Sequence, residues 1–546
     1  MAADPKKIIT RWEQLASARV VFESTWQAIS DDLLGRRDFL TKRTPGERRD
    51  TRLYDGIGMQ SADTFASSLQ GLMVDPSSRW FDLRAQDDDL NEQDDVKRWL
   101  EHVAQRMFDV FSIPRSGHAL AVTEMLLDLG AFGSGAMFVG DVPGKGVIFQ
   151  ARALSELFVA EGADARVDTI FRKYSMTARQ AVQEFGDDAG PKVKKAVADG
   201  RPEEMFEFVH ALYPRDEYSQ GKVDGRNRPI ASCYVSLADK EIVSEGGFYD
   251  MPILFGRWTK DAGEVYGRGP GWNALADMKM LNAMSKTIIA AAQKIVDPPL
   301  LVADDGVVLP VRTVPGGLNF GRMDARGDFI KPLQTGGRLD IGLEMQEQRR
   351  QAIRSAFYSQ ILETMRDPRM TAAQVYALQD EMMRVLGPML GRLQSEMLGP
   401  MIDRTFAIMY RQGAFDEPPE ALLDAPDLRV EYVSPMARAQ KGRKATAIIR
   451  TYEPVLQLAA SDPSVMDNFD NDEAARELVD ANGAPLKILR PKEQVEAMRQ
   501  ARQQAQAQQA EMAAVQQMAA AAKDGAGAVQ SVAGALTPPA SPQAAA

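Results

Sequence analysis

The chain has 546 residues and carries 76 Asp and Glu against 65 Lys and Arg, so its formal net charge is −11. This acidic balance excludes a generally basic protein that coats nucleic acid, and any contact with DNA must be local. The length predicts about two to four domains, and 45% hydrophobic residues are enough to fill their cores.

Cysteine content and hydropathy indicate the cellular compartment of the protein. The single cysteine, Cys233, has no partner for an intrachain disulfide, and the charged start Met1–Lys7 lacks the apolar core of a signal peptide. No stretch approaches about 18 uninterrupted apolar residues, because the best run, 125–139, is broken by Asp128 and by small residues. We therefore expect a protein of a reducing cytoplasm with no membrane span.

Apolar side chains at three- and four-residue spacings predict four helices in the first part of the chain. The first stripe runs from Trp12 to Leu33 and requires Arg19 on its apolar face. The second covers 62–72 and ends at Asp75-Pro76, which is turn chemistry that cannot continue a helix. The third covers 96–110 and the fourth 120–129.

From Ala136 the apolar period shortens to that of strands. Short β-rich runs separated by Gly- and Pro-bearing turns predict strands at 136–139, 147–150, 157–160, 166–174, 205–213, 230–237 and 253–258. Between them Thr177 caps a predicted helix that ends at Phe185. Helices and strands are segregated rather than alternating, which favours an α+β fold over a doubly wound nucleotide-binding sheet.

Two long helices with an insertion between them follow. Good helix formers predict a helix over Asn273–Val296 that stops at Asp297-Pro298, and a return helix over Ile341–Leu362. The insertion Leu300–Leu333 is rich in Gly, Pro and Val. A third helical region, Thr371–Tyr410, contains two near-copies, LGPML at 386–390 and LGPMI at 398–402, whose prolines predict a kink.

The remaining sequence changes from globular to low-complexity composition. A strand at Arg429–Val433 and a helix at Pro435–Ala459 come first. From Pro491 the chain is rich in Gln, Ala and Met, and a seven-residue recurrence, Met498, Ala505, Met512 and Ala519, predicts a weak coiled coil followed by a flexible tail. A wholly disordered, solvated tail is the alternative.

Searches for nucleotide-binding and zinc-binding motifs give no strong candidate. His102, His118 and His210 lie in different segments without zinc-site spacing. The run Gly140–Gly146 has the wrong glycine spacing for a phosphate loop, so we interpret it as a hairpin turn. The run Gly267–Gly271 has a central proline and no βαβ unit around it, which favours a flexible joint over a dinucleotide fingerprint.

Two acidic runs, Asp87–Asp89 and Asp304-Asp305, have the chemistry to bind Mg²⁺ for phosphodiester cleavage. Adjacent aspartates on a turn are much more often a solvated loop, which we favour. A long chain without a credible catalytic constellation indicates a structural or binding protein.

Several runs in a fixed order resemble the portal proteins, or head-to-tail connectors, of short-tailed, podovirus-type bacteriophages. The resemblance extends from the first helix to about residue 460. The runs that carry it are Ser61–Leu72 with Ser77–Phe81, Tyr266–Gly271, Met370–Val375 with Leu386–Pro388 and Arg392–Leu398, and Tyr432–Ala437. Their combination in this order is specific, although no single run is.

The resemblance implies a helix-rich α+β portal fold, with a β-rich wing, long stem helices, a clip insertion and a helical crown. By this mapping the wing is 1–272, the first stem helix 273–299, the clip 300–333 and the second stem helix 334–362. A tunnel loop at 363–370 and a long kinked wing helix with a strand at 371–434 lead to the crown at 435–490 and a tail at 491–546, part of which could form a helical barrel.

The resemblance also implies a function and partners. A homo-dodecameric ring at one capsid vertex would conduct double-stranded DNA, without sequence preference, during packaging and ejection. Its partners would be the packaging terminase ATPase, tail adaptor proteins, and capsid and scaffold proteins. Such a protein is not an enzyme and implies no cofactor, metal or membrane. It would be assembled in the host cytoplasm and found in the virion. A scaffold or tail adaptor, or a metal-dependent nucleic-acid enzyme, remains the alternative.

Five basic residues are candidates to contact DNA in the channel. Lys279, Lys286 and Lys294 share one side of the first stem helix, and stacked rings of positive charge would result if they face the lumen. The alternative is pairing with Glu344 or Glu347 of a neighbouring stem helix. Arg366 and Arg369 lie in the tunnel loop, where they could touch phosphates; from local sequence alone this segment is an ordinary connection between helices.

Overall fold

The computed structural model describes residues 4–34, 53–87, 89–142, 146–218, 224–297, 299–302, 330–332, 339–364, 384–423, 428–432, 435–481, 488–490, 494–510 and 512–513. The chain divides into two compact units. Unit 1 comprises Met1–Leu83, His102–Glu417 and Val430–Met436, and unit 2 comprises Arg84–Glu101, Pro418–Arg429 and Ala437–Ala546.

The four helices predicted at the start of the chain are confirmed. They are α1 (Pro5–Ile29), α2 (Ile57–Met73), α3 (Asp94–Ser112) and α4 (His118–Phe132). Helix α1 continues as a π-helical turn, Ser30–Leu34. Arg19 is buried as its place in the stripe requires, because its guanidinium donates to the carbonyl oxygens of Leu154, Ser155 and Leu157.

Two antiparallel sheets form the β-rich part of unit 1. The three-stranded sheet has the order β3-β2-β9, with β2 (Ser134–Val142), β3 (Gly146–Arg152) and β9 (Ile253–Arg257). The five-stranded sheet runs β4-β5-β6-β7-β8, with β4 (Leu157–Glu161), β5 (Val167–Thr177), β6 (Met205–Pro214), β7 (Ile230–Ser236) and β8 (Glu241–Phe248). Val142 pairs with Gly146, which confirms the hairpin interpretation of Gly140–Gly146; Pro143–Lys145 lie outside the described residues.

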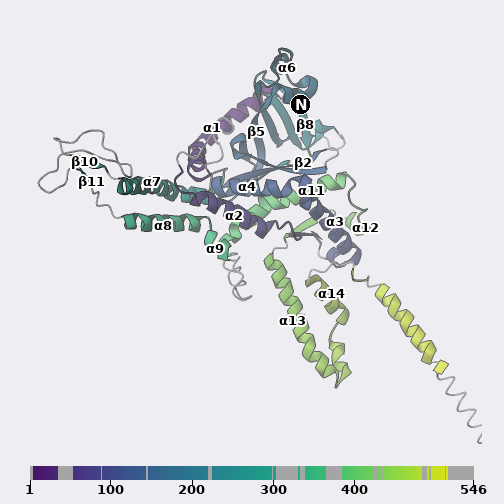
Figure 1. The fold of residues 1–546 in the computed structure, drawn as a ribbon. Helices are drawn as coiled ribbons and strands as arrows, with labels where there is room; N and C mark the ends of the chain where they lie inside the picture. Colours follow the sequence, from purple (N-terminus) through teal and green to yellow (C-terminus); the bar gives the residue numbers. More distant parts are fainter. Residues whose placement is uncertain are drawn as a thin grey trace, which may run out of the picture. The chain divides into compact units, whose positions relative to one another are not determined.

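Helices cover both faces of the five-stranded sheet (Figure 1). On one face α1 contributes Ile8 to a core with Phe171 and Cys233. On the other face α5 (Ala178–Phe185) and α6 (Pro191–Ala198) pack Ala181 and Val193 against Phe208. Helix α5 begins where predicted, because Thr177 and Gln180 form a capping box.

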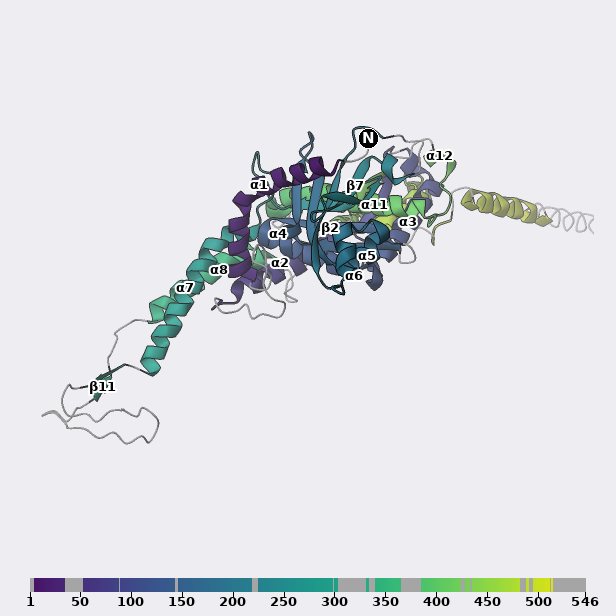
Figure 2. The same cartoon turned by 90° about the horizontal axis from the view of Figure 1, so that it is seen from above.

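The two long helices in the middle of the chain form a helical hairpin, which we call the stem hairpin because it covers the predicted stem. Helices α7 (Pro270–Val296) and α8 (Leu339–Ala356) run side by side away from the sheets, and the short strands β10 (Leu300–Val302) and β11 (Ile330–Pro332) pair beyond their far ends (Figures 1 and 2). The return helix is not continuous as predicted. It stops at Ala356 because Phe357 turns into the core against Phe65 and Tyr358 adopts φ 56°, and α9 (Ser359–Thr364) follows.

A helix over 384–411 contains the two near-copies. Its middle is a π-helical turn, Gln394–Leu398, followed by α11 (Gly399–Arg411). The copies are offset by twelve residues, which in an α-helix would rotate the second copy by about 120°. The π-turn absorbs the extra residue, so Leu386 and Leu398 are both buried. The sequence predicts an irregularity in this helix in the form of a proline kink, and the irregularity that the structure shows is the π-turn. Residues 371–383, at the start of the predicted helix, lie outside the described residues.

Unit 2 is mainly helical. Its elements include α12 (Glu420–Leu423), most of α13 (Pro435–Ala459), α14 (Asn471–Ala481) and a helix over 494–510. The strands β1 (Phe81–Ala85) and β12 (Leu428–Tyr432) form a two-stranded sheet, and each has residues assigned to both units. Polar contacts join its segments, because Arg98 donates to the carbonyl oxygen of Leu489 and Arg476 pairs with Asp94 at 3.2 Å. Among the described helices of both units, none is long and apolar enough to cross a membrane.

Candidate DNA-channel surface

The stem hairpin is held together by a mixed apolar and polar seam. Helix α7 buries Ala274, Met278 and Leu281 on one face. Further along the same seam the buried Gln346 amide donates to Ser285 Oγ at 2.8 Å. Arg349 of α8 binds Asp277, the one acidic residue of α7, at 2.9 Å. The only carboxylate of α7 is therefore paired within the seam, and the lysines of α7 lie outside the seam.

The joint before α7 is closely packed, which corrects our expectation of a flexible joint at Gly267–Gly271. A Cβ atom at Gly267, Gly269 or Gly271 would clash with backbone oxygen atoms at the end of α4 or just after it. These glycines therefore allow close approach of two backbones. The base of α8 is also fixed, because Arg350 binds Asp55 at 2.9 Å.

The structure brings Lys279, Lys286 and Lys294 together on one exposed face of α7. At 100° per residue they span about 80° of the helix circumference, opposite the seam. Small side chains, including Ala283 and Ala290, fill the spaces between them. None of the three lysines forms an ion pair with any residue that the structure describes. Glu347, one alternative partner, is bound within its own helix by Arg350 and Arg354.

The other two candidates, Arg366 and Arg369, lie outside the described residues.

Large apolar side chains are uncovered along the outer part of the hairpin. No described residue buries them, and each is at least two-fifths exposed: Met280, Ile289, Ile295 and Val296 on α7, and Ile341, Leu343 and Met345 on α8. A surface of this kind on a projecting element indicates contact with another protein surface.

Sequence reasoning missed a buried ionic hub. Arg257, at the end of β9, is 1% exposed and binds Glu396 of the π-turn through Nε and Nη2 at 3.0 and 2.6 Å. It also contacts Glu161 of β4, which Lys260 binds as well. Bonds from Lys260 and Arg257 outweigh the opposing effect of burial and lower the pKa of Glu161. The hub joins both sheets to the long helix, and no local motif marks it.

The histidines do not form a site. Burial lowers the pKa of His118 and of His210 to about 3, so both are neutral, while His102 lies on the surface 3.6 Å from Asp416. Within the described ranges, no three His, Cys, Asp or Glu side chains are placed to hold a metal ion. Asp88, Asp304 and Asp305 fall outside those ranges.

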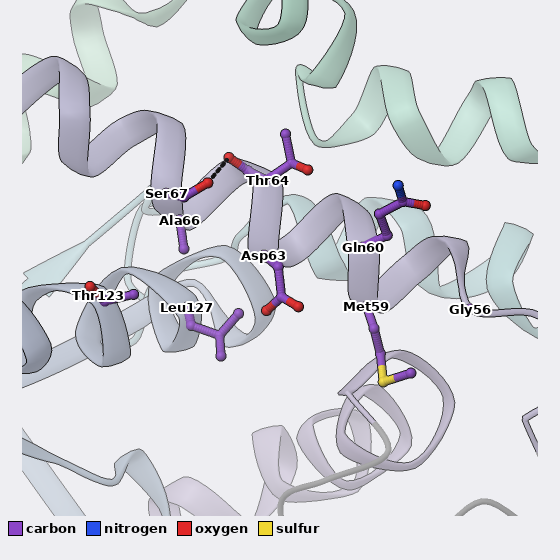
Figure 3. Close-up of a pocket in the computed structure, with 9 residues that line it drawn as sticks. All are labelled: Gly56, Met59, Gln60, Asp63, Thr64, Ala66, Ser67, Thr123 and Leu127. Carbon is purple, nitrogen blue, oxygen red and sulfur yellow. Dashed lines mark hydrogen bonds between the residues drawn. The ribbon is translucent and has the colours of Figure 1, made fainter.

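An open pocket of about 600 Å³ lies between α2 and α4 (Figure 3). Its lining is Gly56, Met59, Gln60, Asp63, Thr64, Ala66, Ser67, Thr123 and Leu127. Asp63 is the single ionisable residue of this lining, and Ser67 donates to the backbone oxygen of Thr64. The pocket therefore offers no acid–base or nucleophile–base pair.

The fold and the hairpin surface define a class: an α+β protein whose two-helix projection carries exposed apolar side chains, and lysines that form no ion pair with a described residue. A family model described as bacteriophage head to tail connecting protein matches residues 5–489. The chain therefore belongs to the bacteriophage head to tail connecting proteins, and the family and the α+β fold expected from the sequence are confirmed. This family is structural, and its members are components of the phage particle.

Individual relatives agree with this assignment. The portal protein of Salmonella phage epsilon15 is 32% identical over 519 residues, which cover 93% of each chain. A probable portal protein of Bordetella phage BPP-1 is 30% identical over 521 residues, or 92% of each chain.

Among solved structures, a chain from the neck of an empty gene transfer agent particle is 14% identical, with a TM-score of 0.36, covering 76% of this chain and 92% of that chain. A chain from the virion of the native particle is 12% identical, with a TM-score of 0.32, covering 78% and 95%.

Proposed function

We propose that copies of this chain form a closed, dodecameric portal ring at one vertex of the phage capsid. Double-stranded DNA passes through the ring during packaging and ejection. The packaging terminase ATPase and later the tail adaptors dock on it, and capsid and scaffold proteins surround it during assembly in the host cytoplasm. The subunit itself performs no catalysis and takes no cofactor. Family membership and the two portal-protein relatives support this proposal.

The observation that carries the proposal is the surface of the stem hairpin. An isolated hairpin would leave seven large apolar side chains exposed to water, which is unfavourable. Packing of hairpins from neighbouring copies side by side would bury them. The lysine face of α7 points away from the seam, so it can face a central channel while the flanks contact neighbouring copies.

The charge pattern suits a conduit. Successive lysines on α7 lie about 10–12 Å apart along the helix axis, whereas DNA carries one charge per about 1.7 Å. Sparse positive rings on an acidic subunit would centre the DNA without neutralising many of its phosphates. Weak, sequence-independent contact lets the DNA slide.

Within this proposal the parts keep the boundaries of the sequence mapping. The wing is 1–272, the stem helices are 273–299 and 334–362, the clip is 300–333, and the crown is 435–490. The tunnel loop is 363–370, the long wing helix with its strand is 371–434, and the tail is 491–546. The close packing before α7 supports a rigid attachment of stem to wing.

The lysine face is tested by the triple variant K279E/K286E/K294E. If the lysines face the lumen, rings should form normally and particles should retain less DNA after packaging. If they contact a neighbouring stem helix, ring assembly itself should fail. The matched control is K192E/K194E/K195E on α6, which reverses three exposed lysines of unit 1 and should affect neither step. Normal assembly with normal DNA retention would contradict the proposed role.

A further inference from the structure

The return helix of the stem hairpin is interrupted where its local sequence favours a helix. Helix α8 ends at Ala356 and α9 begins at Ser359. Neither glycine nor proline occurs between Leu343 and Leu362, so the residues that usually kink or end a helix are missing from this segment. The break is therefore imposed by the surrounding structure, and a continuous helix is an alternative form of the same residues.

The backbone of the break is strained at Tyr358. Its φ of 56° lies in the left-handed region, which is unfavourable for a residue with a bulky side chain. Two other described non-glycine residues have a positive φ, Ala165 and Lys240, and both lie in short connections between antiparallel strands, where this conformation is common. Tyr358 lies between two helices, so no hairpin turn requires its conformation.

A buried hydroxyl adds to the cost of the break. Ser359 is 1% exposed, and its Oγ has no hydrogen-bond partner among the described residues. In a continuous α-helix a serine hydroxyl can donate to the backbone oxygen four residues earlier, which here belongs to Ser355. In the broken helix that oxygen accepts the N–H of Tyr358 instead, at 3.0 Å.

Burial of apolar side chains compensates for these costs. Phe357 is fully buried with its ring 6.1 Å from that of Phe65, and the Tyr358 ring lies 6.1 Å from that of Trp258. Leu362 of α9 is also buried. A continuous helix would not keep Phe357 and Leu362 on one face, because five residues correspond to a rotation of about 140°. The break therefore buries two side chains that a regular helix would separate.

We propose that Phe357–Ser359 form a joint with two positions. In the bent position, which the structure shows, Phe357 and Leu362 are buried and Tyr358 is strained. In the straight position α8 and α9 form one helix, Tyr358 takes a helical conformation, the Ser359 hydroxyl bonds to Ser355, and Leu362 leaves the core. Each position satisfies groups that the other leaves unsatisfied, which keeps both accessible. The joint sets the direction in which the chain leaves the stem hairpin, and it does not depend on the proposed ring.

The strain at the joint is tested by a pair of substitutions at Tyr358 in the full-length protein. Y358G and Y358A both lose the aromatic ring, so the difference between them reports the backbone. Glycine tolerates a positive φ and alanine does not, so Y358G should unfold at a higher temperature than Y358A. The control pair Q351G and Q351A, at an exposed position within α8, should show the opposite order. Greater stability of Y358A than of Y358G would overturn the proposal, because Tyr358 would then be helical.

The buried hydroxyl provides an independent test. S359A should raise the unfolding temperature, because it removes a buried polar group that has no partner in the bent position. The matched control is S285A, which removes a buried hydroxyl that accepts a hydrogen bond from Gln346 at 2.8 Å, and which should lower the unfolding temperature. A lower unfolding temperature for S359A would count against the proposal.

The straight position itself is tested by the distance between two spin labels across the joint. The labels are placed at Q348C and Q360C in a C233A background, and labelled protein is diluted with unlabelled protein so that only distances within one copy are measured. The bent joint should give one main distance. F357L, which keeps an apolar side chain but loses the aromatic contact with the core, should add a second distance, and S359A should reduce it. One unchanged distance in F357L would overturn the proposal.

Discussion

The indole nitrogens of Trp26 and Trp272 donate to the same acceptor, the carbonyl oxygen of Phe132, at 3.2 and 2.8 Å. Trp26 belongs to α1, Trp272 to the first turns of α7, and Phe132 is the last residue of α4. The final carbonyl groups of a helix have no partner within it. Helix α1 and the first turn of α7 are thus both hydrogen-bonded to one backbone oxygen atom at the end of α4.

This shared acceptor predicts a non-additive pair of substitutions. W26F or W272F alone leaves one of these two indole bonds to the Phe132 oxygen, whereas the double variant removes both. The loss of unfolding free energy in the double variant should exceed the sum of the single losses by about 1 kcal/mol. Denaturant unfolding measures it. W12F is the matched control, because the Trp12 indole nitrogen is buried and has no hydrogen-bond partner among the described residues. Strict additivity would mean that the shared bond is unimportant.

The ionic hub predicts a loss of stability in acid. The pKa of Glu161 is lowered in the folded protein, so its contribution is present above the ordinary value of 4.5 and is lost as the pH falls through the lower, folded-state value. Calorimetry across this range should show that E161Q is less stable than wild type at neutral pH and loses less stability in acid. E203Q, which alters an exposed carboxylate, should follow wild type. Parallel pH curves for E161Q and wild type would contradict this coupling.

Because of the π-turn, we predict that the burial of the leucines in the helix over 384–411 depends on the exact number of residues in that helix. Deletion of Ser395 would convert the turn to α-helix and rotate the buried Leu386, Leu390 and Leu393 out of the core. Each exposed leucine costs about 1.5–3 kcal/mol, so the deletion should prevent folding or lower the unfolding temperature strongly. S395A keeps the residue count and should behave as wild type, since Ser395 is exposed. A stable deletion variant would show that the helix can bury other residues.

Most of the helices and strands could be predicted from the sequence, because a stripe such as Trp12–Leu33 reflects local periodicity. Strand β8 was missed, since Glu241–Phe248 contains two glutamates, a serine and two glycines and lacks an alternating apolar pattern. The break at Phe357-Tyr358 was also missed, because it depends on a distant contact with Phe65. The near-copies at 386–390 and 398–402 are evident in the sequence. The π-turn between them is not, because it forms only when both copies bury their leucines in the same core.

The candidate DNA-channel surface was predictable only where it depends on a local pattern of residues. The lysine face of α7 follows from residue spacing on one helix, and the structure confirms that the three lysines are exposed on one side. The Arg257 hub brings together residues that are 96 and 139 positions apart in the sequence, which no local pattern reveals.

Removal of the tail should leave assembly intact. The helix over 494–510 is exposed along its length, and its described ion pair to the rest of unit 2 is Arg499 with Asp472 on the surface. A stop codon at Lys492 keeps Leu489 and Arg490, whose carbonyl oxygens bind Arg98 and Arg476. Electron microscopy of the truncated protein should show normal rings. If rings fail to form, the tail is an assembly element.

The proposed tunnel loop, 363–370, gives a prediction for the late stage of DNA packaging. R366A/R369A should give normal rings and procapsids but should impair the end of packaging or the retention of DNA, since we propose that these two side chains of each subunit contact phosphates. Particle yield and DNA content after purification measure this. Full, stable particles at wild-type yield would show that the loop does not engage DNA.

The central claim, that this subunit builds a ring with a channel, is tested most directly by electron microscopy of the purified full-length protein viewed down its axis. We predict closed rings with a central hole, and native mass spectrometry of the same sample should give one high-order oligomer. A stable monomer or dimer at all protein concentrations would contradict the account.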